Sequence, residues 1–230
     1  MIETLATYWK FLKYPRLPLQ LADKKAVWKE LLWLLILDLA FALVIILTYY
    51  TLLKFHLIVK YEDPDLLKYG FPVAMLLAVV FAPVLEELVF RWQLRKPKVS
   101  IWFVGISAAL ITGSFLKNDN VLFAIYIAFF IATLTVTILT DKLKRLKAVH
   151  VFRNYYVFLF YYTAIVFGYV HMSNIKGLTL SDPSFILYIG SQIFGGLTMG
   201  YIRVKYGLKY SMSLHAAFNA IMVPLAWLSM

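Results

Sequence analysis

The chain of 230 residues contains no cysteine and only 12 aspartates and glutamates. Without cysteine, the protein has no disulfide bond, no thiolate metal site and no cysteine nucleophile. Against so few acidic residues stand 23 lysines and arginines, which give a net charge of +11. In a membrane protein such an excess commonly reflects loops that face an anionic leaflet, and we predict no nucleic-acid partner.

Charged residues of both signs are scarce, at 15% of the chain, whereas hydrophobic residues make up 62%. A single soluble core could not bury that much apolar surface, so the composition predicts an all-α, polytopic membrane helix bundle. Seven apolar stretches have the roughly 17–25 residues that a membrane-spanning helix needs. They are Leu31–Leu53, Phe71–Phe90, Ser100–Leu116, Val121–Thr140, Tyr155–His171, Phe185–Ile202 and Ser211–Leu228.

Residues 1–30 precede the first stretch and carry no cleavable signal pattern. We predict that they form an amphipathic interfacial segment, and that residues 31–230 form a single transmembrane domain. With seven crossings, 18 lysines and arginines fall on the side of the N-terminus and 5 on the other, which places the N-terminus in the cytoplasm of a cell-membrane protein. The side chains of the interfacial segment that we expect to face lipid are Trp9, Phe11, Leu12 and Tyr14.

Two adjacent carboxylates, Glu86 and Glu87, lie near the end of the second apolar stretch and are followed by Arg91. A charge at the bilayer centre costs roughly 2.5–3.5 kcal/mol on insertion scales, so two of them need partners or a function. On a helix, Glu87 and Arg91 are i,i+4 neighbours in the more favourable order. Glu86 points about 100° away from Glu87 and is left free for chemistry.

Two histidines lie in other apolar stretches. His171 ends the fifth stretch, one helical turn after Phe167, and His215 begins the seventh, one turn before Asn219. Intramembrane ionisable groups face the bundle interior and one another, so these side chains and the glutamates could converge in one cavity. Asp38, in the first stretch, has no basic residue at helical spacing. We expect it near the interface or bonded to a neighbouring helix, outside the site.

Such a set of side chains is suited to hydrolysis. A carboxylate in a dry pocket is a general base for water, and a neighbouring histidine can share the proton or orient the water. A second histidine and an asparagine amide can donate to the oxyanion of a tetrahedral intermediate. Two histidines and a glutamate also form a known zinc site with an open position, so the residues alone leave a metal as an alternative.

These residues fall into three ordered motifs on three apolar stretches. The motifs resemble those of the CAAX protease and bacteriocin-processing family of intramembrane proteases, also called CPBP or Abi, and are similar to those of type II CAAX prenyl endopeptidases. The resemblance covers about residues 71–224. The motifs are Glu-Glu-x-x-x-Arg (Glu86, Glu87, Arg91), Phe-x-x-x-His (Phe167, His171) and His-x-x-x-Asn (His215, Asn219).

The resemblance implies an intramembrane endopeptidase that acts on a membrane-associated or amphiphilic substrate, with or without a prenyl group. It implies that Glu86 and His171 activate water and that His215 and Asn219 stabilise the oxyanion. Members described as glutamate proteases need no metal, so we expect no cofactor, with zinc as the alternative. The expected partners are a membrane-embedded peptide or protein and the lipid bilayer, and the oligomeric state stays open. The supporting residues would be Glu87, Arg91 and Phe167.

The spacing departs from the family's usual pattern. About eighty residues separate Glu86 from His171, because an additional hairpin of two apolar stretches lies between them. Hydropathy also places Glu86 toward the cytoplasmic end of its stretch and His171 toward the far end of its own. The two can therefore meet only deep in the bilayer, or where a helix is broken at Pro83 or Gly168.

Three alternatives stay open from the sequence. A catalytically silent relative would act by binding another membrane protein, as a scaffold or an immunity protein. A proton-coupled transporter would also use glutamates and histidines, although inverted repeats are not evident. A serine protease would need Ser107, Ser114 or Ser191, but small polar residues commonly serve helix packing. Packing is also the role that we predict for Gly196 and Gly200.

Overall fold

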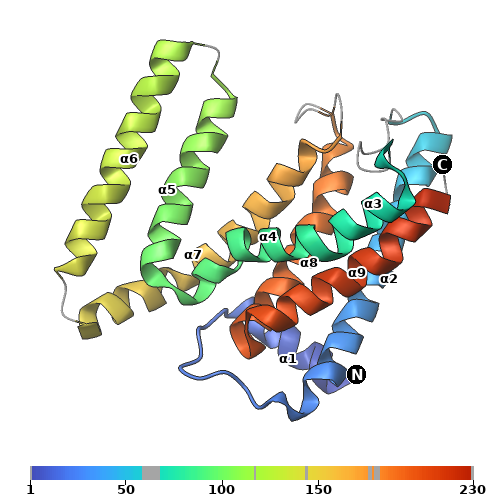
Figure 1. Ribbon diagram of the computed structural model, residues 1–230, viewed down its shortest axis with the longest axis horizontal. Helices are drawn as coiled ribbons and strands as arrows, with labels where there is room; N and C mark the ends of the chain where they lie inside the picture. Colours follow the sequence, from blue (N-terminus) through green and yellow to red (C-terminus); the bar gives the residue numbers. More distant parts are fainter. Residues whose placement is uncertain are drawn as a thin grey trace.

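The computed structural model describes residues 2–58, 68–116, 118–142, 145–175, 178 and 182–228. Within these ranges all regular structure is helical, and seven helical segments are long and apolar enough to span a membrane (Figure 1). The predicted all-α, polytopic class is confirmed, and each predicted apolar stretch overlaps one of the segments. The segments are Lys24–Lys54, Phe71–Phe90, Pro97–Ser114, Asp119–Asp141, His150–Met172, Phe185–Tyr206 and Leu208–Leu228.

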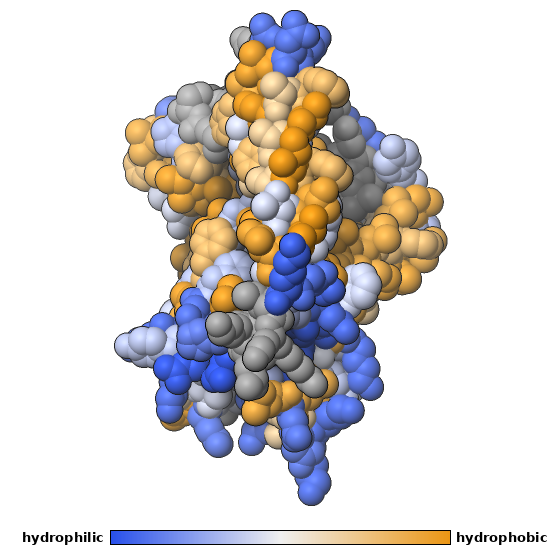
Figure 2. Space-filling model, turned by 90° about the vertical axis from the view of Figure 1, so that its left-hand side faces the viewer, coloured by the Kyte–Doolittle hydropathy of each residue, from blue (hydrophilic) through white to orange (hydrophobic). Residues whose placement is uncertain are grey.

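The surface of the molecule has the polarity that a bilayer requires. Figure 2 shows a broad hydrophobic band with a small hydrophilic tip above it and a larger hydrophilic region below it. Helix α6 (Asp119–Asp141) illustrates the band, because Thr133 is its one buried residue while apolar side chains such as Phe123 are exposed. Lipid tails solvate such side chains well, so their exposure favours membrane insertion.

Helices α7 (Arg145–Met172) and α8 (Phe185–Tyr206) pack closely along a row of small residues. A Cβ atom on Gly196 would lie 3.3 Å from Ala164, and one on Gly200 would lie 3.0 Å from the ring of Phe160. The close helix approach predicted from these glycines is confirmed. Gly168 also lies against α8, and α7 runs through it without a break.

The second spanning segment is helical throughout, with a π-helical turn ahead of Pro83. It consists of α3 (Phe71–Leu76), a π-helical turn η3 (Leu77–Phe81) and α4 (Ala82–Phe90). The Ala82 N–H donates to the Leu77 carbonyl, five residues back, and Pro83 has no N–H to donate. The Ala78 carbonyl is therefore left without a donor from its own helix. Asn219 of α9 (Leu208–Leu228) supplies one, with its Nδ2 atom 2.7 Å from that oxygen.

Helix α5 (Pro97–Ser114) and α6 form the additional hairpin, which stands beside the other helices (Figure 1). Helix α5 packs on α7 through three serine–tyrosine hydroxyl pairs of 2.9 Å that recur every seven residues. A seven-residue repeat is the period of left-handed helix packing. The hydroxyls of Ser107 and Ser114 therefore serve packing, which leaves Ser191 of the three serines that a serine protease would need. The pairs are Ser100–Tyr155, Ser107–Tyr162 and Ser114–Tyr169.

Helix α1 (Ile2–Lys13) docks on the bundle through one side. Tyr8 and Leu12 are buried, and Phe11 packs against aromatic rings of α7 and α8. The prediction that Phe11 and Leu12 face lipid is wrong, because the stripe that they form with Tyr8 at helical spacing has a bundle face to cover. Trp9 and Tyr14 are exposed, as predicted. Burial raises the pKa of the Tyr8 hydroxyl above its ordinary value, so it stays protonated.

A buried polar contact joins α2 (Val27–Lys54) to α8. The buried Glu30 carboxylate accepts hydrogen bonds from the hydroxyls of Tyr201 and Tyr206, and the Lys205 ammonium lies 2.8 Å from both of its oxygens. Every oxygen of this carboxylate therefore has a partner, which is the condition under which a buried charge is tolerated. The contact fixes α2 against the end of α8.

Candidate active site

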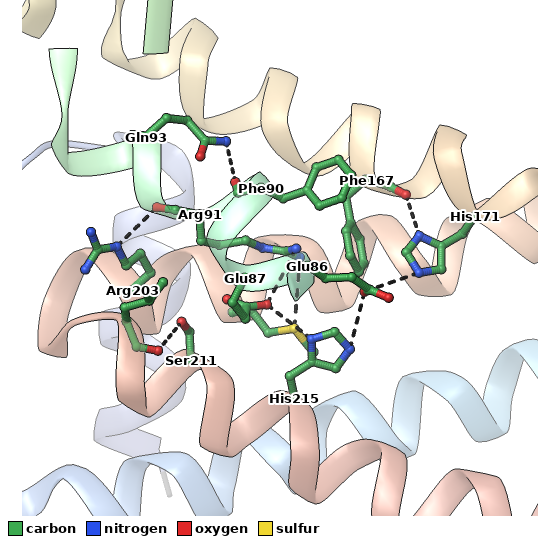
Figure 3. Close-up of polar contacts among 12 residues, drawn as sticks. Glu86, Glu87, Phe90, Arg91, Gln93, Phe167, His171, Arg203, Ser211 and His215 are labelled. Atoms are coloured by element: carbon green, nitrogen blue, oxygen red, sulfur yellow. Dashed lines mark hydrogen bonds and ion pairs between the residues drawn. The ribbon is translucent and has the colours of Figure 1, made fainter. Parts of the chain in front are cut away.

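Glu86, His171 and His215 come together from α4, α7 and α9 (Figure 3). The Oε2 atom of Glu86 lies 3.5 Å from Nε2 of His171 and 3.7 Å from Nε2 of His215. Glu86 and His171 meet although hydropathy places them toward opposite ends of their stretches. The glutamates follow a π-helical turn in their own segment, and α7 runs obliquely to α5 and α6 (Figure 1).

The two histidines are held in the same tautomer. His171 Nδ1 lies 2.7 Å from the Phe167 carbonyl, and His215 Nδ1 lies 3.2 Å from Oε1 of Glu87. A carbonyl and an ionised carboxylate only accept hydrogen bonds, so both Nδ1 atoms carry hydrogen. Both Nε2 atoms then face Oε2 of Glu86. A proton on that oxygen or on one of the Nε2 atoms is shared when the three groups draw within hydrogen-bond distance of one another.

Glu87 and Arg91 form the buried ion pair that the sequence predicts. Nη1 of Arg91 lies 3.5 Å from Oε1 of Glu87, and the two side chains are 2% and 0% exposed. The guanidinium stacks on Phe167 with Cζ 3.8 Å from the ring centroid, and it also contacts the sulfur of Met199. Glu86, by contrast, is 25% exposed. One carboxylate is thus fixed by partners, whereas its neighbour is partly exposed and has a buried Oε2 atom with no hydrogen-bond partner among the described residues.

Phe167 is in contact with both Arg91, of the buried ion pair, and His171. Its ring lies between the guanidinium of Arg91 and the imidazole of His171, whose centroid is 4.2 Å away, while its carbonyl orients the same imidazole. A cation over an aromatic face is attracted to it, and more strongly when desolvated. The side chain that sequence reasoning named as supporting is therefore placed to hold both Arg91 and His171.

The end of α4 is held by a residue that the sequence did not single out. Arg203 of α8 donates from Nε to the Arg91 carbonyl at 3.1 Å and from Nη2 to the Trp92 carbonyl at 3.3 Å. Because α4 ends at Phe90 and gives way to η4 (Trp92–Arg95), these carbonyls lie where a helix leaves acceptors unsatisfied. Arg203 thereby fixes the position of the segment that carries the glutamates. The signal available in the sequence was a basic residue in the last turn of an apolar helix.

Two adjoining cavities open onto the histidines. The His215 cavity has a volume of about 390 Å³ and is also lined by Asn219, Phe167 and Asp38. The His171 cavity has a volume of about 720 Å³. The two share lining residues of α2, α8 and α9, among them Ile46, Gln192 and Met222, so the histidines line neighbouring, mainly apolar cavities.

Asn219 lies in the wall of the His215 cavity with one amide hydrogen committed to the Ala78 carbonyl. An asparagine amide has two hydrogens, so one is left for a ligand. We expect Asn219→Ala to lower kcat by about 10²–10³-fold, the usual cost of losing one oxyanion donor. Steady-state kinetics and a melting curve of the purified variant test this. A rise in KM alone would contradict the oxyanion role, and a lower melting temperature with kcat unchanged would assign Asn219 to holding the π-helical turn through the Ala78 carbonyl.

The atoms of the site include donors that zinc accepts, namely imidazole nitrogens and a carboxylate oxygen. Within the part of the chain that the structure describes, however, no three His, Asp or Glu side chains are grouped so that they could hold a metal ion. The arrangement instead directs both histidines at one carboxylate oxygen.

A family model described as type II CAAX prenyl endopeptidase Rce1-like matches residues 68–221, about two thirds of the chain. The chain belongs to this family. The Rce1-like match includes α4, α7, most of α9 and the additional hairpin, and it contains all the motif residues. Helices α1 and α2 lie outside it. Comparison with curated proteins and with solved structures gives no match. Family membership identifies the chain as a multi-pass protein of the CAAX-type intramembrane protease class.

Proposed function

We propose that the protein is an intramembrane endopeptidase in which Glu86 and His171 activate the water that cleaves a peptide bond. The observation that carries the proposal is the position of the Glu86 Oε2 atom between the two Nε2 atoms, beside an apolar cavity. The separations of 3.5 and 3.7 Å are longer than hydrogen bonds. Catalytic contacts of this kind commonly tighten when substrate binds.

In the first step, Glu86 takes a proton from water, with His171 orienting that water, and the oxygen bonds to the peptide carbonyl carbon. The carbonyl becomes an oxyanion that accepts hydrogen bonds from Nε2–H of His215 and from the free amide hydrogen of Asn219. For this donation His215 carries hydrogen on both nitrogens before water is attacked, with the one proton that Glu86 and the two histidines hold between them on its Nε2 atom, and the Glu87 carboxylate beside Nδ1 stabilises this cation. Glu86 finally returns its proton to the leaving nitrogen as the C–N bond breaks, which gives an acid and an amine.

The proposed substrate is a membrane-associated or amphiphilic peptide, since the cavity beside the histidines is mainly apolar. A prenylated CAAX peptide is the form that the family description indicates. We further propose a metal-independent reaction, supported by the spacing of the described His, Asp and Glu side chains. The proposed setting is the cell membrane with the N-terminus in the cytoplasm, supported by 18 lysines and arginines on one side against 5.

The test compares the membrane peptidome of cells that make the wild type with that of cells that make Glu86→Gln at equal expression. We expect peptides or new chain ends in the wild-type cells alone, and their persistence when purified enzyme is treated with a chelator. Identical peptidomes would favour the silent scaffold instead. Loss of cleavage under chelation, restored by zinc, would overturn the metal-independent mechanism.

A further inference from the structure

Asp38 of α2 lies in the wall of the His215 cavity, where sequence reasoning did not place it. It is 3% exposed, and its Oδ1 atom accepts a hydrogen bond of 2.8 Å from the Thr198 hydroxyl. That hydroxyl is in turn 3.1 Å from the hydroxyl of Tyr8. The second oxygen, Oδ2, has no hydrogen-bond partner among the described residues. Asp38 is thus fixed on one side and unpaired on the other, in the cavity that His215 and Asn219 also line.

A buried carboxylate oxygen without a donor is unfavourable in apolar surroundings, and such atoms are rare in native proteins. An extended peptide inside a membrane lacks hydrogen-bond acceptors, because its backbone N–H groups find no water and no partner within the peptide itself. Most of the cavity wall near Asp38 is apolar, with side chains such as Ala42, Phe194 and Met222. Oδ2 is therefore well suited to receive an N–H donor from a bound peptide.

We propose that Asp38 binds the substrate peptide by accepting a hydrogen bond from one of its N–H groups at Oδ2. The proposal rests on the proposed peptidase function and extends it to α2, which lies outside the family match at residues 68–221. The acceptor would hold the peptide in the cavity beside His215 and Asn219. Asp38 would therefore contribute to substrate binding more than to the chemical step.

The experiment uses an internally quenched peptide with the sequence around a cleavage site found in the peptidome comparison. Its steady-state cleavage is measured with the purified wild type, Asp38→Leu and Asp38→Asn. Leucine removes the acceptor, and asparagine keeps one oxygen that can accept. We expect KM to rise about tenfold or more for leucine and less for asparagine, with kcat within about twofold of wild type.

Glu30→Gln is the matched control, since Glu30 is also a buried carboxylate of α2 but does not line either cavity and has partners on both oxygens. We expect it to lower the melting temperature and leave KM unchanged. An unchanged KM in folded Asp38→Leu, or an equal rise in Glu30→Gln, would overturn the role of Asp38 and leave the proposed peptidase function standing. Failure of the wild type to cleave any peptide, or equal cleavage by Glu86→Gln, would overturn the proposed function and this extension with it.

Discussion

Glu86→Gln is expected to lower kcat by about 10²–10⁴-fold, the usual contribution of a general base. Glutamine has nearly the same shape but cannot take the proton from water. The fold should be unaffected, because Glu86 is a partly exposed side chain whose contacts to the two histidines are too long to be strong hydrogen bonds. The measurement is single-turnover cleavage of a quenched peptide by purified protein, together with a melting curve.

His171→Ala should have an effect of similar size, and the double variant should be little worse than either single one, since two groups that act as a unit are not additive. His150→Ala is the matched control, because His150 is an exposed histidine near the other end of the same helix. Its activity should equal that of the wild type. Independent, multiplying losses from Glu86 and His171 would contradict their joint action on one water.

Arg91→Met is expected to destabilise the protein by about 3–5 kcal/mol, the usual cost of leaving a buried charge without its partner. Arg91 is 2% exposed, and its removal leaves Glu87, at 0%, with no guanidinium. Combining it with Glu87→Gln should recover most of the loss, because the unpaired charge is then gone. Unfolding in mixed micelles, followed by circular dichroism, gives the free energies for this double-mutant cycle.

Lys98→Met is the control for that cycle. The Lys98 ammonium lies 2.8 Å from Asp141, a shorter contact than the one between Arg91 and Glu87, but the two side chains are 70% and 47% exposed. Water and salt screen such pairs, so we expect a change below about 1 kcal/mol. Equal effects of the two substitutions would mean that burial does not set the strength of the Glu87–Arg91 pair.

The fold could be predicted because the length and polarity of an apolar stretch are local properties of the sequence. The meeting of Glu86 with two histidines also followed from a general rule, that intramembrane ionisable groups face one another. The orientation of α1 and the position of Asp38 depend instead on which face of a distant helix is free, and no local pattern reports that. A lone carboxylate in an apolar stretch was the signal for Asp38, but its partner, Thr198, is a residue type that appears throughout such helices.

The origin of the site on three separate helices has a consequence for the biosynthesis of the protein. His215 and Asn219 leave the ribosome about 130 residues after Glu86, a delay of roughly 6–25 s at ~5–20 residues per second. During that interval Glu87 and Arg91 can already pair within one helix, which lowers the cost of inserting their charges. The nascent chain therefore holds its carboxylates in the membrane without the groups that complete the site, and under the proposed mechanism it can hydrolyse a peptide only after α9 has inserted.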